Sequence, residues 1–185
     1  MVGEMGKSSH WAKTPRQSVA EECARRGVTA VVAGCLALLD GRPVDDDLIL
    51  ALGGPPADWV RTGDASGASY WLRVWAARGL LYAWDDSAEP AVLNALHDDA
   101  WRVREMALKV VARHRLEAAF QHVAELCSDP ATRVSAAAAR TTRALTGPAQ
   151  TGASRLFDAC SCAVRRRHRV GGIPSRAQHF PYRHR

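Results

Sequence analysis

The chain has 185 residues, 47% of them hydrophobic, which suits one compact domain and excludes global disorder. The longest apolar run, residues 28–39, is too short to cross a bilayer, and no signal peptide is evident at the start, so we expect a soluble, cytoplasmic protein without membrane contact. The net charge of +6 belongs to the ends, because residues 146–185 carry eight Arg against one Asp while residues 18–145 carry a net charge of −3.

The predicted elements follow an N-terminal arm, residues 1–17, which we expect to be disordered. Apolar spacing then predicts a helix pair over 18–26 and 28–39 and a short helix over 44–52. Gly and Pro interrupt the chain between 53 and 67. Downstream we predict helices over 71–78, 90–97, 101–115, 116–126 and 132–145.

The middle of the chain repeats with a period of 31 residues. Two positions align across three copies: Leu72, Val103 and Val134 at the first, and Ala76, Ala107 and Ala138 at the second. Each copy predicts a short helix, a turn and a longer helix whose buried stripe contains these residues. The small Ala allows the paired helix to approach closely. On the same stripe, His114 is predicted to be an interior histidine.

The clearest copy is Asp98-Asp99-x-x-Arg102-Val103-Arg104-x-x-Ala107, and a second copy starts at Asp129-Pro130. These motifs resemble HEAT repeats of the short, PBS-lyase type, and 22 Arg against 3 Lys suggests a high-GC bacterium. The resemblance implies an all-α, right-handed α-solenoid over residues 18–145, with an N-terminal helix pair capping about three repeats. It also implies that motif Asp and Arg residues form a structural ladder between repeats.

The resemblance further implies that the second helix of each repeat lines a concave surface. Six residues after the core anchor, the helix points away from the core, and this position holds Arg78, Lys109 and Arg140. The predicted partner-binding residues are Arg78, Lys109, Arg113, Arg140 and Arg143, with Trp75 and Tyr82 as apolar anchors. Two interpretations stay open, since exposed Arg also serves solubility alone.

We find no HExxH motif, no GxSxG motif and no phosphate-binding loop, and therefore predict no enzyme activity, catalytic residue, metal or cofactor. The predicted function is a non-catalytic scaffold that binds an acidic protein partner. The alternative is a nucleic-acid-binding HEAT-like protein related to alkylpurine DNA glycosylases, for which Asp85 is the nearest candidate carboxylate.

Residues 146–185 predict a disordered basic tail. The run Arg165-Arg166-Arg167-His168-Arg169 suits nonspecific binding to an acidic surface, but the same composition is typical of a frameshifted reading of GC-rich DNA. Cys160, Cys162 and His168 supply at most half of a zinc site.

Overall fold

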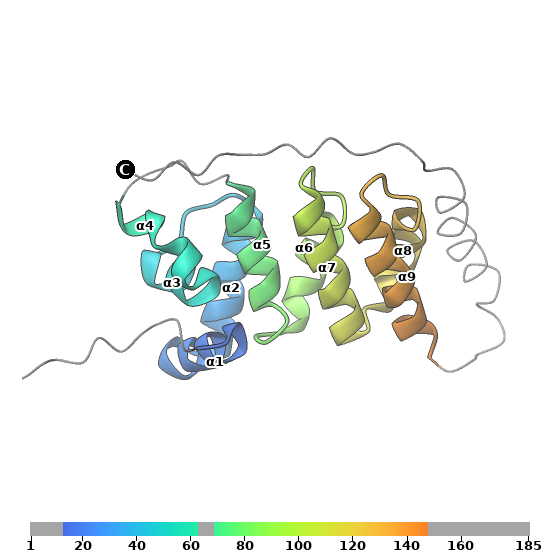
Figure 1. The fold of residues 1–185 in the computed structure, drawn as a ribbon. Helices are drawn as coiled ribbons and strands as arrows, with labels where there is room; N and C mark the ends of the chain where they lie inside the picture. The colour runs from blue at the N-terminus through green and yellow to red at the C-terminus, as the bar shows by residue number, and fades with distance from the viewer. Residues whose placement is uncertain (1–12, 63–68, 148–185) are drawn as a thin grey trace, which may run out of the picture.

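The computed structural model describes residues 13–62 and 69–147, and within these ranges all regular structure is helical (Figure 1). The α-helices are α1 (Pro15–Arg26), α2 (Val28–Leu39), α3 (Asp46–Gly53), α4 (Trp59–Thr62), α5 (Tyr70–Gly79), α6 (Glu89–Ala95), α7 (Trp101–His114), α8 (Phe120–Leu126) and α9 (Thr132–Thr146). Short 3₁₀ turns are η2 (Pro55–Ala57), η3 (Asp86–Ala88) and η4 (Glu117–Ala119). Each of these helices is too short or too polar to span a membrane.

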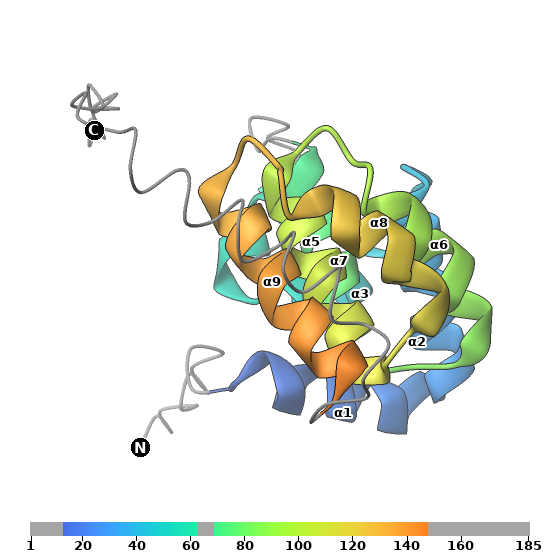
Figure 2. The ribbon, with the colours of Figure 1, turned by 90° about the vertical axis from the view of Figure 1, so that its right-hand side faces the viewer.

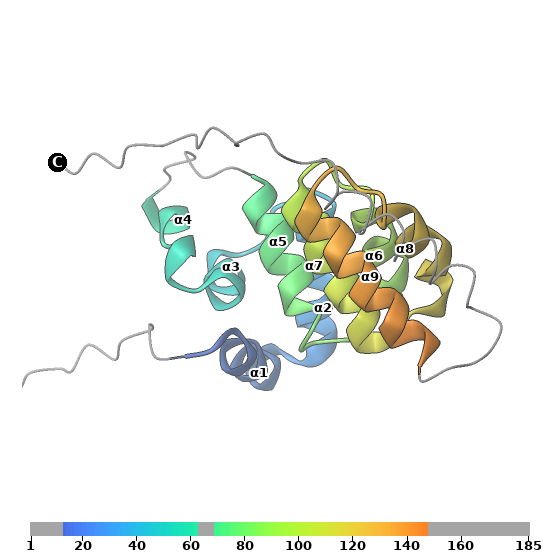
Figure 3. The same ribbon diagram turned by 45° about the vertical axis from the view of Figure 1, so that its right-hand side comes forward.

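The helices form a two-layered stack, which confirms the predicted all-α solenoid. One layer contains α5, α7 and α9, each packed against the next, and the other contains α2, α6 and α8 (Figures 2 and 3). Helix pairs α6–α7 and α8–α9 are successive repeats. Helix α2 packs along α5 and also touches α6, so α2 and α5 form the first repeat.

The first repeat is therefore assembled differently from the prediction, in which residues 44–52 supplied its first helix. Those residues form α3, which packs against α5 in the layer of second helices. Equivalent residues show that α3 takes the place of a preceding second helix. Gly79 of α5 faces Leu52 of α3, and Thr141, which occupies the same repeat position in α9, likewise faces α7, where it donates a 3.0 Å hydrogen bond to the Leu108 carbonyl. Helix α1 packs on α3, so these two helices cover the N-terminal end of the stack.

The boundary predicted for the N-terminal arm is also wrong, because α1 begins at Pro15. Thr14 is the N-cap, its hydroxyl accepts from the Gln17 backbone N–H, and the Gln17 side chain accepts from the Thr14 N–H in return. This capping box with Pro at the first helical position is readable in the sequence. At the other end α9 reaches Thr146, and the predicted tail from residue 148 onward lies outside the described residues.

The predicted buried stripe is confirmed. Val103, Ala107 and Val110 on α7 are fully buried, as are Val134 and Ala138 on α9. His114 at the end of the stripe is half-buried, where its Nε2 lies 2.8 Å from the Leu80 carbonyl and its ring stacks on Trp84 at 4.2 Å. Burial lowers the pKa of His114, so the neutral ring is favoured in this interior position.

Replacing Gly79 tests the packing of α3 on α5. A Cβ at this position would lie 2.5 Å from Leu52 Cδ2 and 2.9 Å from Cys35 Sγ, so Gly79→Val overfills a closed space. We expect it to lower the free energy of unfolding by about 2 kcal/mol or more in urea denaturation. Ala24→Val on the exposed side of α1 is the matched control and should change it by less than about 0.5 kcal/mol. Equal losses in both variants would contradict this packing.

A second test concerns the ion pair that joins α1 to α3. Arg26 donates two hydrogen bonds to Asp45, at 2.7 and 2.9 Å, and these lower the pKa of Asp45 from 3.8 to about 2. Because the folded pKa is depressed, the pair stabilises the fold above pH 4 and that contribution disappears as the pH falls from about 4 to about 2. We expect an NMR carboxyl titration to show the low pKa, and Arg26→Ala to restore the ordinary value. An unchanged titration in that variant would contradict the pairing.

Candidate functional site

Two identical arginine–aspartate pairs connect successive repeats. Arg73 on α5 binds Asp98, with Nε and Nη2 at 2.6 and 3.0 Å from the two carboxylate oxygens. Arg104 on α7 binds Asp129 with the same atoms at 2.9 and 3.1 Å. Both pairs join residues 25 apart and both carboxylates are largely buried. The predicted ladder is therefore present, and these four residues hold the repeats together.

Each aspartate also shapes the loop that precedes the next helix. Asp98 Oδ1 accepts from the Ala100 N–H at 2.8 Å, and Asp129 Oδ1 accepts from the Ala131 N–H at 2.7 Å. Ala100 and Ala131 are the N-caps of α7 and α9, so the aspartates act two residues before the cap rather than as the cap itself. In α9 the ladder position is Ser135, whose hydroxyl donates to Thr132 O within its own helix.

Because the ladder fixes α7 beside α9, equivalent residues on the solvent-facing sides of the two helices lie next to each other. We define the α7–α9 face by the positions that point away from the core: Arg102, Glu105, Lys109, Arg113, Arg133, Arg140 and Arg143. Lys109, Arg113, Arg140 and Arg143 are exposed, as predicted. Glu105 is buried under Lys109 and Arg133, at 3.0 and 3.5 Å. Six cations against one covered carboxylate make this face strongly basic.

Two of the predicted contact residues do not reach this face. Trp75 is only 4% exposed and packs against Trp59, with ring centroids 6.3 Å apart, so it is a core residue and no surface anchor. Arg78 is largely buried, and its Nη2 donates to the Leu52 carbonyl at the end of α3. Desolvation lowers the pKa of Arg78. The physical reason is that α3 packs against α5 and Trp59 of α4 packs on Trp75, neither of which the helical angle alone reveals.

Tyr82 lies with two of the predicted cations at a cleft of about 430 Å³. The cleft is lined by Arg16, Leu81, Tyr82, Lys109, Ala112 and Arg113. Tyr82 is 43% exposed, and the lining contains three cations and no carboxylate. Sequence reasoning missed Arg16 because it placed this residue in the arm; the capping box at Thr14 was the signal that assigns it to α1.

A row of aromatic and arginine side chains crosses the N-terminal ends of α5, α7 and α9. Along it lie Tyr70, Trp71, Arg102, Trp101 and Arg133. Trp71, Arg102 and Arg133 are spaced by 31 residues, so they occupy one repeat position. Sequence analysis missed this row, although the spacing was available as its signal.

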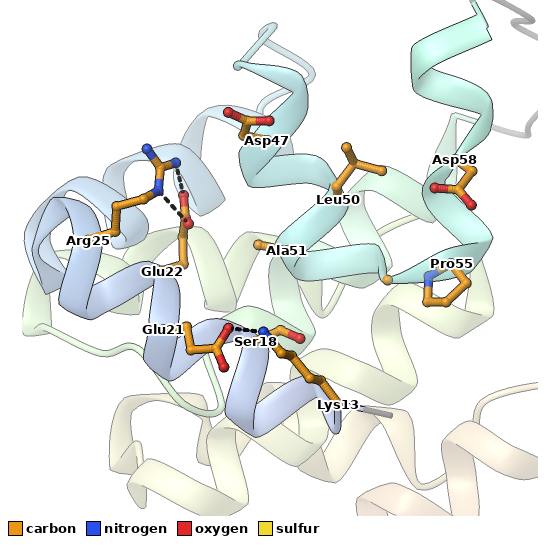
Figure 4. Close-up of a pocket in the computed structure, with 11 residues that line it drawn as sticks. Lys13, Ser18, Glu21, Glu22, Arg25, Asp47, Leu50, Ala51, Pro55 and Asp58 are labelled. Carbon is orange, nitrogen blue, oxygen red and sulfur yellow. Dashed lines mark hydrogen bonds and ion pairs between the residues drawn. The ribbon is translucent and has the colours of Figure 1, made fainter. Parts of the chain in front are cut away.

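A second cleft, of about 270 Å³, lies between α1 and α3 (Figure 4). Its charged groups largely satisfy one another, since Lys13 binds Glu21 at 2.6 Å and Arg25 binds Glu22 at 2.7 Å. Asp47 and Asp58 also line it, so carboxylates outnumber cations. This cleft has the opposite charge to the α7–α9 face and is not part of it.

The candidate carboxylate Asp85 has a local role. Its Oδ1 accepts from both the backbone N–H and the hydroxyl of Ser87, which starts the η3 turn. Within residues 13–62 and 69–147 no three His, Cys, Asp or Glu side chains gather as a metal site would require. The half zinc site of the tail lies outside the described residues.

Comparison with known proteins bears on the repeat architecture. Residues 64–143 match the model of the family described as HEAT repeats. This match supports the interpretation that the chain is a HEAT-repeat protein. It covers α5 to most of α9, the part of the stack that contains the ladder and the basic face. No curated protein and no solved structure matches the chain.

Asp129→Asn tests the ladder of the HEAT-repeat region. The change leaves Arg104, whose side chain is 14% exposed, without its counter-charge. We expect urea denaturation to show that the free energy of unfolding falls by about 3 kcal/mol. Asp40→Asn, which breaks the exposed Asp40–Arg42 pair, is the control and should cost less than about 1 kcal/mol. A loss at Asp129 no larger than that of the control would refute the structural role of the ladder.

Proposed function

We propose that this protein is a non-catalytic HEAT-repeat scaffold that binds an acidic segment of a protein partner on the α7–α9 face. The observation that carries the proposal is the alignment of six cations from two neighbouring helices around one covered carboxylate. HEAT repeats commonly serve as protein-interaction scaffolds, which agrees with this use of the face.

The rigidity of the face favours binding. Lys109 and Arg140 sit at the same repeat position on helices that pack directly, so their spacing is set by the helix–helix distance of about 10 Å. An acidic partner meets cations whose helices are already fixed by the ladder, and loses little additional freedom on binding. Exposed charges of this kind accelerate association and are screened by salt.

Nucleic acid is the second candidate, and the row from Tyr70 to Arg133 is the observation that favours it. Bases stack on aromatic rings and on guanidinium planes, and the neighbouring cations suit phosphates. A glycosylase activity has no such support, because Asp85 is occupied in the η3 turn. We rank the protein partner first because the region that contains the row matches HEAT repeats, which commonly serve as protein-interaction scaffolds.

The finer assignments made from the sequence form part of the same proposal. The period of 31 residues supports repeats of the short, PBS-lyase type, and the excess of Arg over Lys supports a high-GC bacterial source. The proposed location is the cytoplasm.

Charge reversal on the full-length chain tests the face. We expect Lys109→Glu/Arg140→Glu to weaken binding of a fluorescein-labelled poly-glutamate peptide by about tenfold or more at low salt, measured by fluorescence anisotropy. Lys13→Glu/Arg42→Glu is the control, because it changes the net charge equally at exposed ion pairs elsewhere. The basic tail is identical in both variants.

Equal weakening in the two variants would contradict the proposal, because binding would then follow net charge and not this face. A duplex DNA bound more tightly than the peptide at the same salt concentration, with the same dependence on Lys109 and Arg140, would instead support the nucleic-acid candidate.

A further inference from the structure

The aromatic–arginine row contains a guanidinium that has no counter-charge among residues 13–62 and 69–147. The Arg102 guanidinium carbon lies 4.3 Å from the centroid of the Trp101 ring, 5.4 Å from that of Trp71 and 5.9 Å from that of Tyr70. Three rings therefore restrict one arginine side chain. Stacking of this kind is typical of arginine, whose planar group lies against an aromatic face.

The rings themselves are anchored in the core. The Trp71 ring stacks on Trp75 at 6.3 Å, and Trp75 is buried against Trp59. Tyr70 lies 5.3 Å from Trp71. The position of Arg102 is thus coupled through contiguous rings to α4 and to the N-terminal part of the stack.

Arg102 differs from its neighbours in having no acceptor. Arg73 and Arg104 each bind an aspartate through two nitrogens, whereas Arg102 forms no hydrogen bond or ion pair with any described residue. Its side chain is half-buried, so much of its desolvation has occurred in the free protein. The planar N–H edge remains available, and a carboxylate is the group that matches it with two parallel hydrogen bonds.

The same indole contacts a second arginine. The Arg133 guanidinium carbon lies 5.6 Å from the centroid of the Trp101 ring and its side chain is 71% exposed. Within the described part of the chain its one ion pair is the 3.5 Å contact with Glu105. Trp101 therefore contacts two guanidinium groups from adjacent repeats. Trp and Arg are also the residue types that dominate binding energy at protein interfaces.

We propose that Arg102 is the receptor for a carboxylate of the acidic partner, and that the neighbouring rings contact an aromatic or apolar residue beside that carboxylate. This inference rests on the proposed function and names the feature that its ligand must carry. The row adjoins the other cations of the α7–α9 face, since Lys109 follows Arg102 by seven residues, or about 10 Å along the helix. In an extended partner this distance separates acidic residues about three positions apart.

Two labelled peptides and two arginine-to-lysine variants of the full-length chain test the proposal. One peptide is acidic and carries a Trp beside a central Glu, and the other has Ala in place of that Trp. We expect the Trp peptide to bind more tightly, and Arg102→Lys to reduce its affinity by about tenfold and remove the preference, because lysine keeps the charge but loses the plane. Arg42→Lys, at the exposed Asp40–Arg42 pair away from this face, is the control and should leave the affinity for both peptides unchanged.

The outcomes separate the inference from the function on which it rests. If both peptides bind through Lys109 and Arg140 but Arg102→Lys changes neither affinity, the receptor role of Arg102 is wrong and the scaffold function stands. If neither peptide binds, both are wrong. If a single-stranded oligonucleotide binds more tightly than both peptides and depends on Arg102, the row recognises bases and the proposal is overturned. Thermal unfolding of Arg102→Lys should lie close to that of the wild type, since Arg102 has no ion pair with a described residue to lose and lysine keeps a cation beside the rings.

Discussion

Arg73 and Arg104 each extend from the second helix of one repeat to an aspartate in the loop that begins the second helix of the next. The contact is bidentate and largely buried, and the same aspartate accepts a backbone N–H of its own loop. One carboxylate therefore fixes both the loop and its distance from the preceding helix. Because Asp98 and Asp129 occupy the same repeat position, the two junctions have the same geometry, and the helices stack in register.

That register decides what the surface presents. Side chains 31 residues apart become neighbours on α7 and α9, so Lys109 aligns with Arg140 and Arg102 with Arg133. Arg73 and Arg104 are paired with the ladder aspartates, and the cations of the α7–α9 face remain at the surface. On α5 the position of Lys109 and Arg140 holds Arg78, which α3 covers, and the positions of Arg102 and Arg113 hold Trp71 and Tyr82, which carry no charge. The basic face is therefore confined to two repeats.

Sequence periodicity predicted α2 and the helices from α6 to α9 because their apolar spacing and their pairing are both local. The first repeat could not be predicted in the same way, since α3 lies between its two helices in the chain and packs on α5 from outside the repeat. Helical angles showed correctly that Arg78 points away from the core stripe, but not that the Leu52 carbonyl lies there to receive it. Arg16 was not predicted as a lining residue because the start of the first helix was placed three residues too late. The row around Arg102 was not predicted because Trp71, Arg102 and Arg133 were not compared as one repeat position.

Binding on the α7–α9 face is the central claim, and an NMR titration of the full-length chain with the acidic peptide tests it most directly. The account predicts that the backbone amides of Lys109, Arg113, Arg140 and Arg143 shift together, and that the Arg102 Nε–H shifts when the peptide carries Trp. Shifts confined to residues 148–185, or centred on the cleft between α1 and α3, would contradict it, because binding would then occur elsewhere on the chain.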